Sequence, residues 1–332
     1  MTEETQSLNA VFVEEGAFSV SFFQKRKHHK YREVEAPQLE GPVVDTHAHL
    51  EMLKNPAGEL AKCAYHNVRF VCAMCDPAED SHTTFDNLEK WREDAAGELE
   101  AAGLTEYVPR IPNLRIATGV HPHNAKLWDT RMERTLVKRL ADPRVCALGE
   151  VGLDYHYDLS PRATQRGVFR RQIQLAKMAG IPLILHMREA HTEGLAILEE
   201  EGFPEAGVLL HCFNLDEEAL VPWAEHGCYI AYGGPLTFKK ADEVRAAATK
   251  VLHSRLLTET DSPYMTPEPM RGVDCGPAHT IFTAEKLLEV LGLETQEERA
   301  AMLNKLYQNA VGLLNRPATE WQRQQFRAIA KG

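Results

Sequence analysis

The chain has 332 residues, of which 44% are hydrophobic, and its formal net charge at pH 7 is −11. This apolar share is enough for a sizeable core, but no apolar run approaches the roughly 20 residues that span a bilayer, which argues against a membrane protein. The acidic balance argues against a broad, nonspecific nucleic-acid surface, because such a surface needs many Lys and Arg residues.

Residues 1–40 precede the first predicted barrel strand and are interpreted as an N-terminal extension. The extension begins with acidic and polar residues. A secretory signal instead has a basic segment, then an apolar segment, then small residues, so we expect a cytoplasmic protein. The extension contains one dense basic run, KRKHHKYR at 25–32. We interpret this run as a solvated flank, and the alternative is a nucleic-acid-binding arm.

Eight short apolar runs follow and alternate with segments of helical periodicity. The runs lie at 42–47, 69–74, 114–120, 145–152, 182–187, 207–213, 228–233 and 255–260. This order predicts a parallel α/β sheet, and eight units predict a (β/α)8 TIM barrel over residues 41–315, although a doubly wound open sheet gives a similar pattern. Amphipathic segments after about residue 295 predict extra C-terminal helices, with 316–332 as a helical tail.

Polar residues with metal-binding side chains stand at the carboxyl ends of these runs, where barrel enzymes assemble their sites. In DTHAHL, strand alternation predicts that Asp45, His47 and His49 share one face. The candidate metal ligands are His47, His49, Glu150, His186, His211 and Asp261. Four imidazoles and two carboxylates are too many for one open catalytic zinc, and they suit two divalent ions.

Glu150 is the predicted bridge between the two ions, because it lies midway in strand order and a carboxylate has two oxygens. The other ligands of the first ion are His47, His49 and Asp261, and those of the second are His186 and His211. Two ions held in this way lower the pKa of a water between them, which predicts metal-dependent hydrolysis.

Taken together, six segments resemble the TatD-like metal-dependent deoxyribonucleases. They are DTHAHL (45–50), GVHPH (119–123), GEVGLDYHYD (149–158), LILHMREA (183–190), HCF (211–213) and ETDSPY (259–264). The resemblance covers residues 43 to about 313. It implies a divalent-metal phosphodiesterase that acts on DNA from a 3′ end, with Mg, Mn or Zn as the metal and Asp261 as a candidate base for the attacking water.

Other matched positions are assigned to catalysis or substrate binding, each with a structural alternative. His121 donates to a phosphate oxygen or caps a loop, and Arg188 clamps phosphate or pairs with a surface acid. Tyr155 stacks on a base or packs in the core. Asp154 either shares a side of the predicted strand with Glu150 or has a structural role in the turn that ends the strand. The positive loop residues expected near the pocket of a nuclease are Arg188, Lys239, Lys240 and Arg271.

Two alternative functions remain open at this point. The same metal site could hydrolyse an amide or ester, such as a small cyclic amide or an aminoacyl ester on tRNA, because barrel loops change substrate without changing strands. The other alternative is a binding protein that keeps the fold but has no catalytic activity. The six intact ligands argue against it, because a scaffold does not require them. We expect DNA as the substrate, no membrane, no obligate protein partner and a monomer.

Overall fold

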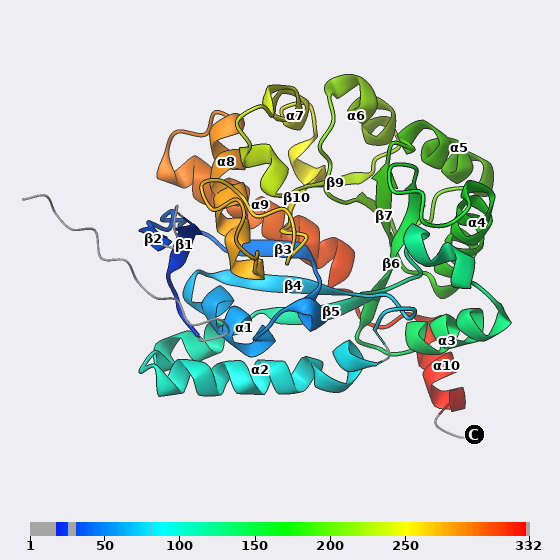
Figure 1. The fold of residues 1–332 in the computed structure, drawn as a ribbon, viewed down its shortest axis with the longest axis horizontal. Helices are drawn as coiled ribbons and strands as arrows, with labels where there is room; N and C mark the ends of the chain where they lie inside the picture. Colours follow the sequence, from blue (N-terminus) through cyan, green and yellow to red (C-terminus); the bar gives the residue numbers. More distant parts are fainter. Residues whose placement is uncertain (1–17, 26–30, 81, 330–332) are drawn as a thin grey trace, which may run out of the picture.

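The computed structural model describes residues 18–25, 31–80 and 82–329. Eight parallel strands form one sheet in the order β10-β9-β8-β7-β6-β5-β4-β3, which curls into a nearly closed barrel (Figure 1). The strands are β3 (Val43–Ala48), β4 (Val68–Cys75), β5 (Asn113–Thr118), β6 (Val145–Asp154), β7 (Leu183–Arg188), β8 (Val208–Leu210), β9 (Tyr229–Tyr232) and β10 (Leu256–Thr258). The predicted TIM barrel is therefore confirmed.

Helices follow the strands and cover the outside of the barrel (Figure 1). They are α1 (Pro56–Tyr65), α2 (Thr83–Ala101), α3 (Thr130–Leu140), α4 (Arg162–Ala179), α5 (His191–Glu201), α6 (Glu217–Glu225), α7 (Asp242–Ala248) and α8 (Thr280–Val290). In α4, the apolar stripe that includes Val168 and Ile173 is buried, and the helix ends at Gly180 with φ +66°, a conformation that glycine adopts at little cost. The period of the apolar residues thus fixes which helix face meets the sheet.

Side-chain hydroxyls close the barrel between its first and last strands. Thr258 Oγ1 donates to the Val44 carbonyl at 2.9 Å, and Thr46 Oγ1 donates to the Thr258 carbonyl at 3.1 Å. Just beyond the strand ends, the Asp261 N–H donates to the His47 carbonyl at 2.9 Å. These bonds hold the segment after β10 against β3, which places residues far apart in the sequence at one end of the barrel.

The barrel interior is filled by side chains and is not a pore. Each strand contributes a buried apolar residue, for example Val44, Ile184 and Leu257. At the amino-terminal end of the strands, Ala310, Leu313 and Leu314 of α9 (Gln296–Leu314) join this cluster. Because α9 covers that end, the opposite, carboxyl end is the one that can open to a substrate.

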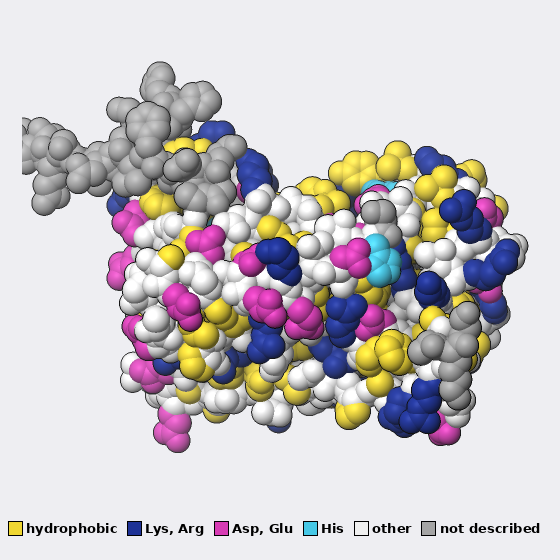
Figure 2. Space-filling view, turned by 90° about the horizontal axis from the view of Figure 1, so that it is seen from below, with side chains coloured by type: hydrophobic (Ala, Val, Ile, Leu, Met, Phe, Trp, Pro, Cys, Tyr) yellow, Lys and Arg dark blue, Asp and Glu magenta, His cyan; other side chains and the backbone are white. Residues whose placement is uncertain are grey.

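Two further elements lie outside the barrel. In the N-terminal extension, β1 (Phe22–Lys25) and β2 (Tyr31–Val34) form an antiparallel pair, whereas residues 26–30 of the basic run lie outside the described residues. At the other end of the chain, α10 (Glu320–Ile329) follows α9. Figure 2 shows one face of the molecule, on which Lys and Arg side chains are interspersed with Asp and Glu. No helix in the described part of the chain is long and apolar enough to cross a membrane.

Candidate metal centre

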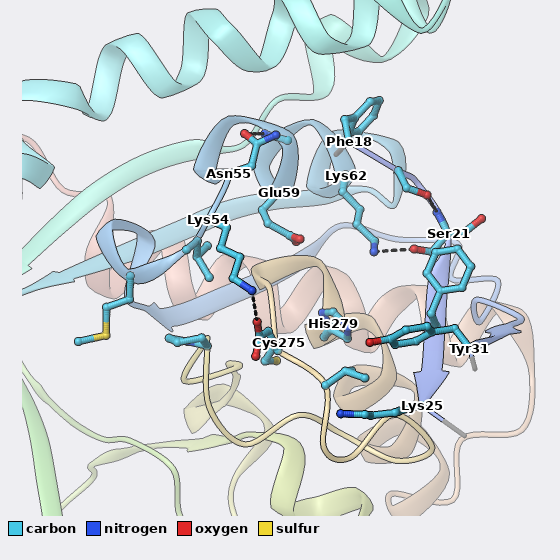
Figure 3. A pocket seen from close by; sticks show the side chains of 18 of the residues that line it. Phe18, Ser21, Lys25, Tyr31, Lys54, Asn55, Glu59, Lys62, Cys275 and His279 are labelled. Atoms are coloured by element: carbon cyan, nitrogen blue, oxygen red, sulfur yellow. Dashed lines mark hydrogen bonds and ion pairs between the residues drawn. The ribbon is translucent and has the colours of Figure 1, made fainter. Parts of the chain in front are cut away.

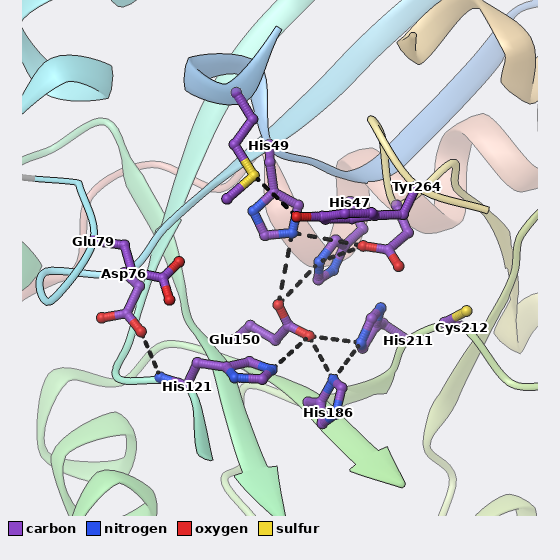
Figure 4. Close-up of polar contacts among 12 residues, drawn as sticks. His47, His49, Asp76, Glu79, His121, Glu150, His186, His211, Cys212 and Tyr264 are labelled. Carbon is purple, nitrogen blue, oxygen red and sulfur yellow. Dashed lines mark hydrogen bonds and ion pairs between the residues drawn. The ribbon is translucent and has the colours of Figure 1, made fainter. Parts of the chain in front are cut away.

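The six predicted ligands meet at the carboxyl end of the barrel, with the Glu150 carboxylate at their centre (Figure 4). They come from strand ends and the loops that follow them: His47 from β3, Glu150 from β6, His186 from β7, and His49, His211 and Asp261 from positions just after β3, β8 and β10. Side chains of residues distant in sequence therefore converge because parallel strands all end on one side.

One oxygen of Glu150 faces the two histidines of DTHAHL. Its Oε2 lies 3.3 Å from His47 Nε2 and 3.8 Å from His49 Nε2. Asp261 Oδ1 completes this side, at 3.7 Å from His47 Nε2 and 3.5 Å from His49 Nε2. Burial opposes a charge on His49, but hydrogen bonds to Asp261 and Glu51 outweigh it and raise the pKa of His49 to about 10. This side therefore attracts a cation.

The other oxygen of Glu150 faces a second set of imidazoles. Its Oε1 lies 2.8 Å from His186 Nδ1 and 2.8 Å from His211 Nε2, and these two nitrogens are 3.3 Å apart. Burial by itself would raise the pKa of Glu150, but the surrounding imidazoles lower it well below its usual range. The two oxygens of one ionised carboxylate thus serve two separate groups.

Carboxylates behind the second group fix which nitrogen of each histidine faces inward. His186 Nε2 lies 3.1 Å from Asp154 Oδ2, so Nδ1 is the nitrogen that faces Glu150, at 2.8 Å from Oε1. His211 Nδ1 faces Glu259 Oε1 at 3.5 Å, and Glu259 is held in turn by the Cys212 N–H at 2.6 Å. A carboxylate on the outer nitrogen is the usual companion of a metal-binding histidine.

Asp154 has both of the roles that its sequence position left open. Strand β6 runs four residues past Glu150, so Asp154 ends it on the same side, fully buried. Its Oδ1 accepts the N–H groups of His156 and Tyr157 and makes the turn. Its Oδ2 also bonds His123 Nε2 at 2.8 Å. Burial would raise its pKa, but these hydrogen bonds lower it, so the carboxylate is ionised at neutral pH.

Asp45 does not join the centre, contrary to the prediction from alternation. Its carboxylate accepts the Thr260 N–H at 2.9 Å, the Thr260 hydroxyl at 2.6 Å and the His47 N–H at 3.1 Å. The pairing of β3 with β4 is irregular between Asp45 and Ala48, so strict alternation fails there. Asp45 instead ties β3 to the segment after β10, beneath the two histidines.

His121 reaches the centre as a hydrogen-bond donor. Its Nε2 lies 3.6 Å from Glu150 Oε1, while its Nδ1 accepts the His123 N–H at 3.2 Å. Burial lowers the pKa of His121 to about 4, so the ring is neutral and its single proton is on Nε2. With Glu150 and His186, His121 lies close enough to share an ion.

A cavity of about 340 Å³ opens above the ligands, and Arg188, Tyr157 and Tyr264 are among the residues that line it. The Arg188 guanidinium carbon lies 4.6 Å from the centre of the Tyr157 ring, which is 54% exposed. The stacked ring holds the cation at the cavity. Arg188 therefore lies where a substrate phosphate could meet it.

Four other predicted substrate residues are not among the described residues that line this cavity. The Tyr155 hydroxyl donates to Glu193 at 2.5 Å, and its partly buried ring packs against the core, the structural alternative to stacking on a base. The Arg271 guanidinium carbon stacks 4.0 Å from the Phe238 ring centre, on a loop whose path no periodicity determines. Lys239 and Lys240 also lie away from it. The substrate roles predicted for Tyr155 and Arg271 therefore stay predictions, with both residues outside the lining of this cavity.

The donor set fits divalent ions. Three groups of side chains in the described part of the chain have ligand atoms within 4.8 Å of one another: His47 with His49 and Asp261, His47 with Glu150 and His211, and His121 with Glu150 and His186. His47 is fully buried, yet neither of its ring nitrogens has a hydrogen-bond partner among the described residues. An unpaired buried nitrogen is costly, and a bound cation would satisfy it.

Several residues at the site were missed by sequence reasoning. His123 and Glu259 both orient ligands, and both lie inside quoted motifs, GVHPH and ETDSPY. The repeat of His at every second position in GVHPH was a usable signal for His123. Tyr264 also lies inside ETDSPY, whereas Glu51 directly follows DTHAHL and carries no such signal.

The comparisons with known proteins agree with this geometry. The family model described as TatD related DNase matches residues 44–314. The relative named "Uncharacterized metal-dependent hydrolase YcfH", from Escherichia coli strain K12, is 35% identical over 261 residues, which are 77% of this chain and 90% of that protein. The human protein named "3′-5′ RNA nuclease TATDN2" is 29% identical, over 78% of this chain and 33% of its own.

Among solved structures, the chain is similar to the TatD homologue YjjV from Escherichia coli K12. The TM-score is 0.64 at 23% sequence identity, with 83% of this chain and 98% of that chain covered. At this identity the likeness supports the barrel fold alone.

Proposed function

The chain belongs to the TatD-related DNase family and is a metal-dependent hydrolase, and from that premise we propose that it is a phosphodiesterase that removes nucleotides from the 3′ end of single-stranded DNA. The observation that carries the proposal is the carboxylate of Glu150, whose two oxygens face two separate groups of histidines at 2.8–3.3 Å. A bridging carboxylate of this kind suits the two-ion chemistry of phosphodiester hydrolysis.

Glu150 would hold both ions, one at each oxygen. The other proposed ligands are His47, His49 and Asp261 for the first ion, and His186 and His211 for the second. When bound, a pair of divalent ions lowers the pKa of a water and stabilises the attacking and leaving oxygens. We assign His121 to the phosphate and not to an ion, as the sequence predicts, although His121, Glu150 and His186 lie close enough together to hold one.

Asp261 is proposed to accept the proton of the attacking water. Burial would raise its pKa, but the hydrogen bond to His49 and the charges of nearby imidazoles lower it, so the carboxylate is ionised and can take a proton on Oδ2 while Oδ1 faces the histidines. Its backbone has φ +60°, an unfavourable conformation for a non-glycine residue. Bonds from its N–H to the His47 carbonyl and from the Tyr264 N–H to its own carbonyl keep it there. Strain held in this way is a feature of functional sites.

Arg188 and His121 are proposed to bind the phosphate. The Arg188 guanidinium can donate two hydrogen bonds to phosphate oxygens, and stacking on Tyr157 limits its motion. His121 offers one N–H from Nε2 as a neutral donor. Two donors on the side of Glu150 opposite Asp261 suit a phosphodiester attacked from the Asp261 side.

The size of the cavity favours a strand end over a duplex. About 340 Å³ is near the lower limit of the roughly 300–1,000 Å³ typical of small-molecule pockets, so it suits one terminal unit of a chain. Intermixed charges on the face in Figure 2 and the net charge of −11 are also unlike a surface that grips duplex DNA along its length.

The test is hydrolysis of a 3′-labelled single-stranded DNA by metal-stripped protein, resupplied separately with magnesium, manganese and zinc. Glu150→Ala runs alongside, and an RNA of the same sequence serves as a second substrate because one matched relative is named an RNA nuclease. We expect metal-dependent release of labelled mononucleotide that the variant lacks. Cleavage of RNA alone would replace DNA as the substrate, and no cleavage with any metal would refute the nuclease and turn attention to amides and esters.

A further inference from the structure

A second cavity, of about 490 Å³, lies between the N-terminal hairpin and the barrel (Figure 3). We call it the hairpin cleft. Its walls are β1, the segment 52–62 that leads into α1, and the loop 263–275 that follows β10. None of the six candidate metal ligands lines it, so it is a separate feature of the described structure.

The hairpin wall of the cleft is fixed to the barrel at both ends of β1. Lys62 Nζ donates to the Ser21 carbonyl at 2.7 Å, and Gln24 Nε2 donates to the Pro269 carbonyl at 2.6 Å. Phe22 is 1% exposed, with its ring 4.9 Å from that of Phe282 in α8. The cleft is therefore already formed before any ligand binds.

Strand alternation decides which residues of β1 face the cleft. Phe22 packs against Lys62 of α1 and Phe282 of α8, so its neighbours Ser21, Phe23 and Lys25 lie on the opposite, cleft-lining face. Tyr31 of β2 pairs directly with Lys25 in the register and lines the cleft as well. Directly opposed residues share a face, so a phenyl ring, a phenol ring and an ammonium group stand together on one wall.

Positive charges gather at the cleft. Lys25 of β1, Lys54 in the turn before α1 and Lys62 of α1 approach the same space (Figure 3), in a chain with a net charge of −11. Two acids also line it. Asp274 Oδ2 pairs with Lys54 Nζ at 3.5 Å. Burial raises the pKa of Glu59 and lowers that of Lys62, which disfavours the charge on both. Lys25, which is exposed at the end of β1, is therefore the cation at this wall best placed to meet a ligand.

The cleft adjoins the metal-centre cavity. Met52 lines both cavities, and the Tyr264 hydroxyl, at the edge of the metal centre, lies 3.7 Å from the Met52 sulfur. A strand whose last nucleotide fills the smaller cavity must leave it through an opening, and the cleft begins at Met52.

We propose that the hairpin cleft binds the single-stranded segment that precedes the scissile 3′-terminal nucleotide. The inference rests on the proposed function, and it names the form of the substrate as an extended single strand. Phe23 and Tyr31 would stack on bases, and Lys25 would meet a backbone phosphate. Aromatic rings interleaved with cations are how proteins bind single strands with little sequence preference.

The test compares a dinucleotide with a dodecanucleotide. Affinity is measured by fluorescence anisotropy on the metal-loaded protein, with a phosphorothioate at the last linkage to slow cleavage, and KM is measured with unmodified DNA. In Phe23→Ala/Lys25→Ala, we expect the Kd of the dodecanucleotide to rise at least about fivefold, the loss of one stacked base. The KM of the dinucleotide and kcat should stay the same, because the dinucleotide does not reach the cleft.

Phe326→Ala/Lys138→Ala is the matched control, since both residues are exposed on α10 and α3, away from the hairpin (Figure 1). Phe23→Leu keeps apolar bulk but removes stacking, so it should also weaken binding of the dodecanucleotide while retaining the melting temperature. Equal Kd values in the cleft variants, the control and the wild type would overturn the proposal. Loss of binding in the cleft variants without cleavage by any metal would support the cleft and refute the proposed function.

Discussion

Replacement of Glu150 by glutamine should abolish two-ion binding while the barrel still folds. The side chain keeps its size but loses the charge that faces His186 Nδ1 and His211 Nε2 at 2.8 Å and His47 Nε2 at 3.3 Å. Loss of a residue that merely orients a metal ligand costs about 10–100-fold in metal affinity. Glu150 faces both groups directly, so we expect more than about 100-fold, or about 2.7 kcal/mol, at each site.

The assay is calorimetric titration of metal-stripped Glu150→Gln with manganese, next to the wild type. Glu79→Gln is the control, because Glu79 lines the same cavity but bonds Asn124 at 2.8 Å and contacts none of the six ligands. Glu79→Gln should bind two ions with nearly unchanged affinity. If Glu150→Gln also bound two ions within about tenfold of the wild-type affinity, the bridging role would be wrong.

Three further predictions concern the surroundings of the centre. Asp154→Asn should weaken metal binding by about 10–100-fold, because with its amide oxygen toward His123 and His186 its NH2 group would face the backbone N–H groups that Asp154 Oδ1 accepts. Unchanged affinity in a manganese titration would contradict this. Arg188→Ala should raise the KM for single-stranded DNA by about tenfold, the loss of one hydrogen bond to a charged group, with the metal content intact. Burial lowers the pKa of His279 to about 3, so as pH falls this histidine is protonated in the unfolded chain before it is protonated in the folded chain. The free energy of unfolding should therefore fall as pH drops from about 6.5 toward 3, by up to about 1.4 kcal/mol per unit, and His279→Asn should reduce that slope in urea denaturation.

The barrel and its ligands were predictable because both depend on periodic features. Buried parallel strands read as short apolar runs, and parallel strands end on one side of the sheet, so His186 and Asp261 could be brought together without a structure. The extent of β6 was not predictable. Its last residues, Gly152 to Asp154, are less apolar than its start, and hydrogen bonding to β7 continues to Asp154 regardless.

Loop positions account for the predicted residues that do not line the cavity. The alternation of side chains stops at the turn after β6, where Asp154 accepts backbone N–H groups of the turn. In this turn Tyr157 lines the cavity and Tyr155 does not. Arg271 lies on a loop whose course depends on contacts with Phe238. The hairpin of β1 and β2 was not predicted, because strands of four residues are too short to show an alternation of apolar and polar residues.

The most direct test of the two-ion centre is anomalous diffraction from crystals grown with manganese. We predict two peaks about 3.5–4 Å apart, one beside Glu150 Oε2 with His47, His49 and Asp261, and one beside Oε1 with His186 and His211. A single peak, or a pair of peaks that leaves Glu150 uncoordinated, would contradict the account.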